Sequence, residues 1–275
     1  MQIVITGASG FLGSVLLKCL KKNGYNCLGV SRKPGKGYLQ VNDYSDSPVG
    51  DILIHLAEIS DRGLANELSA TYELDAARTL NSLLSKGYSK IIYVSSAALY
   101  GDNISEPRTE NDLIIASDTY ARVKLNAEQK VLSRNGIVIR LSNIYRPNMS
   151  RNNVFSRILE QLNGLGPVTV MNTNPIRDFL WVDDAANAML KMVIQSVSGV
   201  FNIGSGIGTS IRVLAQEILS ASNQEKREIL SIKPDPRESC IVLDITKSSL
   251  VLDWSPNLSL KEGIARLINL QRDNC

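Results

Sequence analysis

Short apolar runs alternate with longer stretches of helical spacing through the first half of the chain. The apolar runs predict β-strands at residues 3–6, 27–30, 51–56, 90–95 and 136–141, and the longer stretches predict helices at 11–23, 64–86 and 119–134. The strands are nearly continuous apolar runs rather than alternating ones, which is typical of strands covered on both faces. The pattern therefore favours an α/β fold with a doubly wound parallel sheet of the Rossmann type.

After about residue 145 the pattern changes. Asn, Pro and Gly cluster, apolar segments shorten, and helical spacing predicts helices at 154–162, 183–195, 211–220 and 260–271. We expect residues 1–145, with returning segments near 177–204, to form the Rossmann domain. Residues from about 146 to 275 are expected to form a smaller, interwoven C-terminal lobe.

Composition and charge exclude several classes of protein. The 275 residues are 44% hydrophobic and carry 30 Lys and Arg against 27 Asp and Glu, a net charge of +3. This charge is too small and too evenly spread to indicate nucleic-acid or membrane binding. No apolar run approaches the roughly 20 residues that span a bilayer, and Met1 leads directly into a strand-like segment. We therefore expect a cytoplasmic protein with no nucleic-acid or membrane partner.

Cysteine and histidine are too sparse for a metal or disulfide framework. Cys19, Cys27, Cys240 and Cys275 form no Cys-x-x-Cys pair, so reduced thiols are expected. His55 is the single histidine, which excludes sites built from several histidines. No metal is expected, and the place of His55 inside an apolar strand favours a structural role.

A glycine-rich turn follows the first strand directly and leads into the first helix. A strand that turns sharply into a helix presents free backbone N–H groups and the positive helix end to a pyrophosphate. Gly7 would permit the tight turn, Gly10 the close approach of the ligand, and Gly13 the close packing of the helix on the strand. The alternative is a glycine turn without a ligand. The residues expected to contact a dinucleotide here are Gly7, Ser9, Gly10, Phe11, Leu12 and Gly13.

The end of the second strand indicates which dinucleotide is bound. NAD-binding proteins place an Asp or Glu there to hold the ribose 2′-hydroxyl, whereas this chain has Ser31, Arg32 and Lys33. Arg32 would pair with a 2′-phosphate, to which Ser31 would donate a hydrogen bond. We therefore predict NADP(H) rather than NAD(H). The alternative is that Arg32 and Lys33 belong to a solvated loop.

Tyr120 and Lys124 lie four residues apart in a predicted helix and therefore share one face of it. An ammonium group beside a phenol stabilises the phenolate, so the tyrosine can exchange a proton with a substrate. Ser96 follows the strand at 90–95 and could hydrogen-bond the same substrate oxygen. Such a Tyr–Lys pair is common on helix surfaces, and it is the preceding strand-end serine and the glycine turn that favour catalysis.

Taken together, these motifs resemble the extended short-chain dehydrogenase/reductases, in particular the nucleotide-sugar epimerase/dehydratase/reductase group. The resemblance covers nearly the whole chain, and its motifs lie at 6–13, 51–57, 95–101, 120–124, 140–147, 177–184, 201–206, 244–247 and 254–263. It implies that the Rossmann domain binds the dinucleotide, which Arg32 predicts to be NADP, and that the smaller lobe binds substrate. It also implies a homodimer formed through the two long helices at 64–86 and 119–134.

The resemblance implies roles for the candidate cofactor and catalytic residues. Ser96, Tyr120 and Lys124 correspond to the catalytic triad, with Tyr120 as the acid–base group and Lys124 also positioning the nicotinamide ribose. Asp43 corresponds to an acidic residue that contacts the adenine amino group. Leu56 and Ala57 would line the cofactor site.

The resemblance further implies a nucleotide diphosphate sugar as the substrate. Asn143 and Arg177 match positions that lie near the diphosphate, and a guanidinium suits phosphate oxygens. The alternative for Arg177 is an ion pair with Asp178 or Asp183. A second cation is expected from Lys233 or Arg237, of which we favour Arg237.

The chain departs from the family pattern at two informative places. Nucleotide-sugar 4,6-dehydratases follow the catalytic Ser or Thr with Asp-Glu, but this chain has Ala97 and Ala98, which cannot transfer protons. A 4,6-dehydratase is therefore not expected. Arg146 replaces a glycine that is usual before the proline.

Three functions fit this set of residues. The first is NADPH-dependent reduction of the 4-keto group of a nucleotide-linked 6-deoxyhexose, with hydride from the nicotinamide and the proton from Tyr120. The alternative is an NAD-dependent nucleotide-sugar 4-epimerase, which uses the same triad. The third is a non-catalytic dinucleotide-binding regulator, against which the intact Ser–Tyr–Lys set argues.

Overall fold

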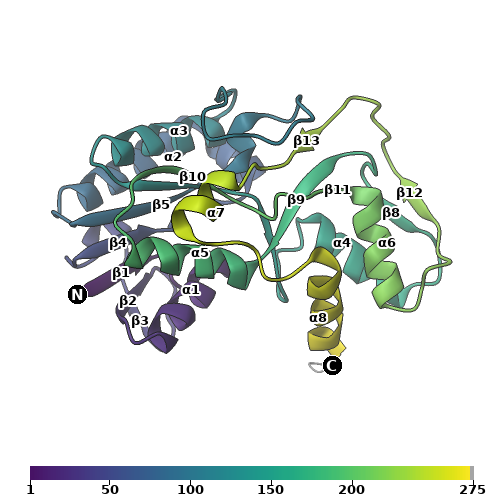
Figure 1. The fold of residues 1–275 in the computed structure, drawn as a ribbon, viewed down its shortest axis with the longest axis horizontal. Helices are drawn as coiled ribbons and strands as arrows, with labels where there is room; N and C mark the ends of the chain where they lie inside the picture. Colours follow the sequence, from purple (N-terminus) through teal and green to yellow (C-terminus); the bar gives the residue numbers. More distant parts are fainter. Residues whose placement is uncertain (273–275) are drawn as a thin grey trace.

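The structure, a computed structural model, describes residues 1–272 of the chain. Figure 1 shows a large α/β part, with the N-terminus at its edge, beside a smaller lobe that holds the last helix. Cys19, Cys27 and Cys240 are free thiols, and Cys275 lies outside the described residues. No helix in the described part of the chain is long and apolar enough to cross a membrane.

A seven-stranded parallel sheet forms the centre of the large part. Its strands, in spatial order, are β10 (Gly199–Ile203), β6 (Ile137–Leu141), β5 (Lys90–Ser96), β4 (Ile52–His55), β1 (Gln2–Thr6), β2 (Asn26–Ser31) and β3 (Tyr38–Gln40). The order reverses at β1, between β4 and β2, and ligands of open parallel sheets bind at the carboxyl edge beside such a switch. The predicted Rossmann-type fold is confirmed.

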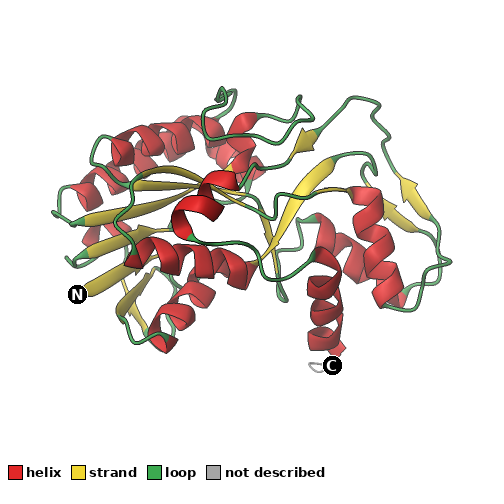
Figure 2. Cartoon of the chain, in the orientation of Figure 1, coloured by secondary structure: helices red, strands yellow, loops and turns green. Residues whose placement is uncertain are grey.

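Helices cover both faces of this sheet, as Figure 2 shows. α1 (Phe11–Lys22), α5 (Val182–Ile194) and α7 (Thr246–Leu252) lie on one face, and α2 (Arg62–Leu84) and α3 (Thr119–Leu132) lie on the other. Each face has its own apolar core, because the strand side chains alternate between the two. Buried Ile5, Ile54 and Ile139 face α1 and α5, whereas Val4, Leu53 and Val138 face α2 and α3.

The smaller lobe contains two short sheets. β9 (Ile176–Trp181) pairs with β7 (Asn143–Tyr145), β11 (Gly208–Ser210) and β13 (Cys240–Ile241), and β8 (Val168–Val170) pairs with β12 (Ile229–Ser231). Three helices, α4 (Val154–Glu160), α6 (Ile211–Ala221) and α8 (Leu260–Arg272), pack around an apolar core. In that core Tyr145 stacks on Phe155, with ring centroids 4.6 Å apart.

The five strands and first three helices predicted from apolar spacing lie within two residues of β1, β2, β4, β5, β6, α1, α2 and α3. The long helix α2 departs from regular geometry at Ser69, where φ is 48°. Three single-turn helices complete the chain: η1 (Tyr44–Asp46), η2 (Ala97–Tyr100) and η3 (Gln161–Asn163). The strands β3 and β7–β13 were not predicted, and six of these eight have only two or three residues, which carry little periodic signal.

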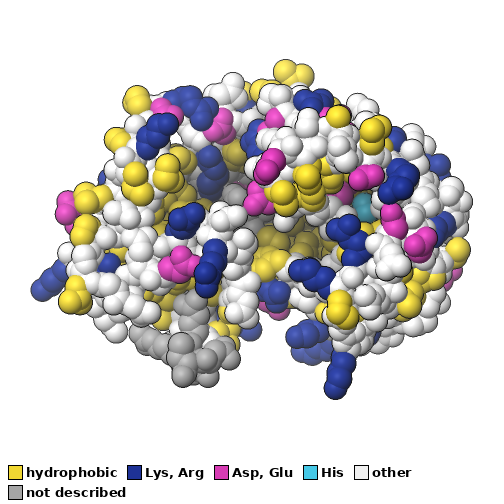
Figure 3. Space-filling view, turned by 180° about the vertical axis from the view of Figure 1, so that it is seen from behind, with side chains coloured by type: hydrophobic (Ala, Val, Ile, Leu, Met, Phe, Trp, Pro, Cys, Tyr) yellow, Lys and Arg dark blue, Asp and Glu magenta, His cyan; other side chains and the backbone are white. Residues whose placement is uncertain are grey.

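The chain crosses between the two parts at β9 and α5. β9 belongs to the small sheet, yet α5 packs against α1, and β10 forms the outer strand of the large sheet. Asp184 fixes this crossing, because its carboxylate accepts hydrogen bonds from the Asn257 amide and the Leu258 N–H. Figure 3 shows that the opposite surface is hollowed between the two parts, with basic side chains around the opening.

Candidate functional site

The glycine turn between β1 and α1 has the geometry of an anion seat. Gly7 has φ +72°, and a Cβ there would lie 2.9 Å from the Leu56 carbonyl carbon, so the turn lies directly against the end of β4. A Cβ at Gly13 would collide with the Gly7 carbonyl oxygen. Gly10 begins α1 without a side-chain cap, which leaves N–H groups of the first turn free to bind an anion. The turn therefore fits the pyrophosphate of a dinucleotide.

The end of β2 lies beside this turn and carries no carboxylate. The hydroxyls of Ser9 and Ser31 lie 2.6 Å apart, and the buried Ser31 hydroxyl also donates to the Lys33 carbonyl. Arg32 is exposed, and its guanidinium carbon lies 5.2 Å from the centroid of the Tyr44 ring. Arg32 is thus the group at this strand end that is free to meet a 2′-phosphate. Its contact with a cofactor stays a prediction, as does that of Ser31.

Asp43, predicted to contact adenine, is engaged within the chain. One carboxylate oxygen accepts the Ser45 N–H at 2.8 Å and the other accepts from Arg78 at 3.1 Å. The Ser45 hydrogen bonds lower the pKa of Asp43, burial opposes them, and the charges of Arg78 and Arg32 lower it further. The residue caps η1, and its contact with adenine stays a prediction.

α3 brings the predicted catalytic residues to the carboxyl edge of the sheet. Asp118 caps this helix by accepting the Ala121 N–H, and the Tyr120 N–H donates to Asn66 of α2. Tyr120 is buried, and the Lys124 Nζ lies 6.0 Å from the centroid of its ring. Lys124 also donates to the Val94 carbonyl at 2.9 Å, which fixes α3 against β5 close to Ser96. The structure therefore brings the helix pair to the strand that ends in Ser96.

Ser96 lies at the end of β5, where its hydroxyl accepts the Ala98 N–H at 3.2 Å and caps η2. A serine hydroxyl that accepts one bond still has its own hydrogen to donate. Ser96 therefore keeps a donor for a substrate oxygen. The following residues Ala97 and Ala98 form the first turn of η2.

A buried glutamate that sequence reasoning missed lies at the same edge. Glu58 follows the apolar segment that ends in Leu56 and Ala57, and its carboxylate lies 2.8 Å from the Lys124 Nζ. The Tyr93 hydroxyl donates to the same carboxylate at 2.6 Å. A carboxylate directly after a buried strand was the available signal, because a buried charge requires a partner.

His55 has the structural role that the sequence favours. Its side chain is 1% exposed, and its Nδ1 lies 2.7 Å from the Thr6 hydroxyl of the neighbouring strand. Burial lowers the pKa of His55 to about 4, against an opposing effect of Glu58. The imidazole is therefore neutral at neutral pH and links β4 to β1.

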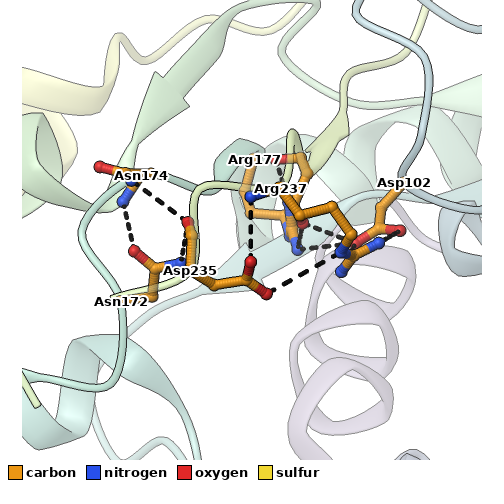
Figure 4. A network of polar contacts seen from close by, with 7 residues as sticks. Asp102, Asn172, Asn174, Arg177, Asp235 and Arg237 are labelled. Atoms are coloured by element: carbon orange, nitrogen blue, oxygen red, sulfur yellow. Dashed lines mark hydrogen bonds and ion pairs between the residues drawn. The ribbon is translucent and has the colours of Figure 1, made fainter. Parts of the chain in front are cut away.

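Two candidate substrate-binding arginines converge on one carboxylate, as Figure 4 shows. Asp102 accepts two hydrogen bonds from Arg237, at 2.9 and 3.1 Å, and the Arg177 Nη2 lies 3.8 Å from it. Ser239 donates to the same carboxylate at 2.5 Å. Burial raises the pKa of Asp102, but these hydrogen bonds and both arginine charges lower it below its ordinary value. Lys233 is not part of this cluster.

Arg177 pairs with neither of the acids considered from the sequence. Besides Asp102, its guanidinium donates to the Ser239 carbonyl at 2.9 Å and the Ser239 hydroxyl at 2.7 Å. Asp178 is buried and accepts hydrogen bonds from the Ser205 and Gly206 N–H groups instead. Contact of Arg177 and Arg237 with a diphosphate stays a prediction.

Asn143 and Arg146 lie at the start of the smaller lobe, in β7 and directly after it. Asn143 is exposed and donates to the Asp178 carbonyl at 3.2 Å. Arg146 reaches the start of α1, where it lies 4.7 Å from the centroid of the Phe11 ring and donates to Ser14 at 3.1 Å. The arginine that departs from the family pattern thus lies beside the glycine turn.

The profile of the NAD dependent epimerase/dehydratase family matches residues 3–204. The match covers more than half of the chain, so the chain belongs to this family. It is an extended short-chain dehydrogenase/reductase of the kind that modifies nucleotide sugars.

Individual relatives include both epimerases and reductases. The chain is 27% identical over 305 residues to a putative UDP-glucose 4-epimerase of Methanocaldococcus jannaschii, and the match covers 99% of each. It is 26% identical over 201 residues to a dTDP-4-dehydro-6-deoxyglucose reductase of Escherichia coli, which covers 68% of this chain and 63% of the relative. The crystal structure of a Thermotoga maritima UDP-glucose 4-epimerase with UDP-glucose has a TM-score of 0.88 at 22% identity, covering 100% of this chain and 99% of the other.

The predicted homodimer is not tested by these observations. α2 and α3 lie side by side, as a four-helix interface would require. Of the leucines of α2, Leu80, Leu83 and Leu84 pack on the sheet, while Leu68 and Leu74 are 43% and 73% exposed. A dimer stays a prediction.

Proposed function

We propose that this chain transfers a hydride at C4 of the hexose of a nucleotide sugar, with Tyr120 as the proton-transfer group. The glycine turn would hold the pyrophosphate of a dinucleotide, and Arg32 would lie near its adenosine end. When bound, the nicotinamide supplies or accepts the hydride. The support for its site is the turn itself, because side chains at Gly7 or Gly13 would collide with neighbouring backbone.

The observation that carries the proposal is the buried pair on α3. Tyr120 and Lys124 lie on one helix face at the end of β5, with the Lys124 Nζ 6.0 Å from the centroid of the Tyr120 ring. Oxidation of the 4-hydroxyl requires Tyr120 to accept its proton, and reduction of a 4-keto group requires Tyr120 to donate one. Ser96 donates a hydrogen bond to the same substrate oxygen and holds it in place.

Of the two reactions, the comparisons favour 4-epimerisation, the alternative in the sequence analysis. The putative UDP-glucose 4-epimerase matches over 99% of both chains, whereas the reductase matches over 68% of this one. We therefore place epimerisation first. In an epimerase the hydride leaves C4 and returns to the other face of the same carbon, so no nicotinamide is consumed.

One feature of the site favours NADPH-dependent reduction of a 4-keto sugar as a second candidate. An exposed Arg32, and no carboxylate, ends the segment that would hold the adenosine ribose. This arrangement suits a 2′-phosphate, and a net reductant consumes its cofactor stoichiometrically. The partial match to a dTDP-4-dehydro-6-deoxyglucose reductase agrees with it.

Stoichiometry separates the two candidates. The purified chain is incubated with UDP-glucose and NAD, and separately with dTDP-4-keto-6-deoxyglucose and NADPH, while the absorbance of reduced nicotinamide is followed. Formation of UDP-galactose without a net change in absorbance supports epimerisation. One NADPH consumed per deoxysugar formed supports reduction. If neither occurs with a panel of nucleotide diphosphate hexoses, the proposal is wrong.

Tyr120→Phe tests the mechanism and the regulator alternative together. This change removes the proton-transfer group, so turnover is expected to fall by roughly 10²–10⁴-fold while dinucleotide binding stays nearly unchanged. Tyr88→Phe, which removes a buried hydroxyl bonded to the Pro48 carbonyl, is the matched control and should keep its activity. An active Tyr120→Phe variant would show that another group carries the proton.

A further inference from the structure

Glu58 brings a negative charge into contact with the candidate catalytic lysine. Its carboxylate oxygen Oε2 lies 2.8 Å from the Lys124 Nζ, and the two side chains are 5% and 8% exposed. The proton transfer described above does not use this carboxylate. An ion pair this well shielded from water is strong, because solvent and salt screen it little.

Few other groups around the pair are charged. His55 on β4, with its pKa of about 4, is neutral. Burial raises the pKa of Tyr93 on β5 and of Tyr72 on α2, so both phenols keep their protons. On α3 itself, Glu128 faces Lys124 but is paired with Arg140 at 2.8 Å. Glu58 and Lys124 therefore form a nearly neutral unit beside Tyr120.

Contacts within this unit also fix the ammonium group in place. An ammonium has three N–H donors. In Lys124, one of them donates to the Val94 carbonyl at 2.9 Å and a second meets the Glu58 carboxylate. Burial lowers the pKa of Lys124, but Glu58 and Tyr120 raise it by more, so the lysine stays charged. One donor remains for a ligand.

We propose that Glu58 is a positioning residue that anchors Lys124 and offsets its charge, and thereby sets the pH at which Tyr120 changes from proton donor to proton acceptor. This inference rests on the proposed function of Tyr120. A lone ammonium beside a phenol favours the phenolate, whereas an ammonium neutralised by a carboxylate favours it less.

The consequence follows from the proton balance of each reaction. In reduction, hydride adds to the carbonyl carbon and the Tyr120 phenol gives its proton to the oxygen, leaving a phenolate. In oxidation the phenolate takes the hydroxyl proton as the hydride leaves carbon. Glu58 therefore favours the donor state at neutral pH, and it shifts the onset of oxidation to more alkaline pH.

Glu58→Gln tests this, because it keeps the size and hydrogen-bonding ability of the side chain and removes the charge. We expect the pH midpoint for proton loss by Tyr120 to fall by about one unit or more. The midpoint is read from tyrosinate ultraviolet absorbance, as the difference between each protein and the same protein carrying Tyr120→Phe. Glu73→Gln, which breaks the Arg122 ion pair on the outside of the same helices, is the matched control and should leave the midpoint unchanged.

The pH–rate profile supplies the second readout. The same shift should move the rising limb of epimerisation, or the falling limb of ketone reduction, to lower pH by the same amount. A Glu58→Gln variant whose limb and tyrosinate midpoint match the unaltered protein would overturn the inference, even if kcat falls. Because the absorbance measurement needs no substrate, it holds whether or not the proposed function fails.

If Glu58→Gln does not fold, the tyrosinate absorbance of the unaltered protein still tests whether Glu58 offsets the charge of Lys124. With the lysine charge offset, no Tyr120-dependent tyrosinate signal should appear near neutral pH. A signal that appears near neutral pH would show that Glu58 does not offset Lys124.

Discussion

Replacing Arg32 by Ala is the most direct test of which dinucleotide the chain uses. Arg32 follows β2, its guanidinium carbon lies 5.2 Å from the centroid of the Tyr44 ring, and no carboxylate stands at the strand end. A 2′-phosphate at this place would accept charge-assisted hydrogen bonds from the guanidinium. The change should therefore weaken the binding of NADPH and leave NADH nearly unaffected.

The magnitude follows from the exposure of Arg32. Hydrogen bonds to charged groups contribute about 1.5–3 kcal/mol, whereas exposed ion pairs contribute about 0.2–1 kcal/mol. For an exposed guanidinium facing a doubly charged phosphate we take about 1–2 kcal/mol, which corresponds to a roughly five- to thirtyfold higher Kd. The contact with Tyr44 is lost for both dinucleotides, so it cancels in the ratio of their Kd values.

Fluorescence titration with NADPH and NADH measures that ratio for the unaltered protein and the variant. Lys33→Ala is the control, because it removes the adjacent exposed cation and should change the ratio less than about twofold. Equal weakening of both dinucleotides by Arg32→Ala would show that Arg32 acts through the fold. An unaltered protein that prefers NADH would refute the assignment of NADP(H) outright.

Two further changes test the supports of the site. Burial raises the pKa of Asp118, but the Ala121 hydrogen bond and Arg62 lower it by more. The ionised carboxylate therefore stabilises the fold above pH about 4, and this stabilisation is lost as the pH falls through the lowered pKa. Asp118→Ala should lower the free energy of unfolding by about 1–2 kcal/mol at neutral pH and by much less in acid. Urea denaturation measures both values, and an equal loss at the two pH values would contradict this prediction. Asp102→Asn removes the carboxylate that pairs with Arg177 and Arg237, so UDP should bind up to about fivefold more tightly. Calorimetry measures the Kd, and an unchanged affinity would mean that the diphosphate binds elsewhere.

The large sheet could be predicted because its signals are local and long. Each predicted strand is a nearly continuous apolar run, and the glycine turn directly follows the first of them. The smaller lobe could not be predicted in this way, since β13 has two residues and β7, β8, β11 and β12 have three each. These strands depend on pairing between distant segments, such as Cys240 with Ile176, and not on a pattern of their own.

In the candidate site too, local spacing could be predicted from the sequence and contacts between distant segments could not. The Tyr120–Lys124 pair could be predicted because both residues lie on one helix, where spacing alone determines the shared face. The convergence of Arg177 and Arg237 on Asp102 could not, because the three residues come from β9, from the loop before β13 and from the segment after η2. The sequence identified the two cations and missed the anion between them.

Glu58 shows how such a partner can be expected, if not located, from sequence. Glu58 comes three residues after β4 and its side chain is 5% exposed, and an uncompensated buried charge costs several kcal/mol. The rest of the fold must therefore supply a cation or keep the acid protonated. Lys124 is the one lysine among residues 1–270 that is buried in the structure, and it lies on the helix that covers this strand end. The lysine assigned to catalysis is thus also the partner that Glu58 requires, so a change at either residue should alter both the stability of the sheet edge and the proton transfer at Tyr120.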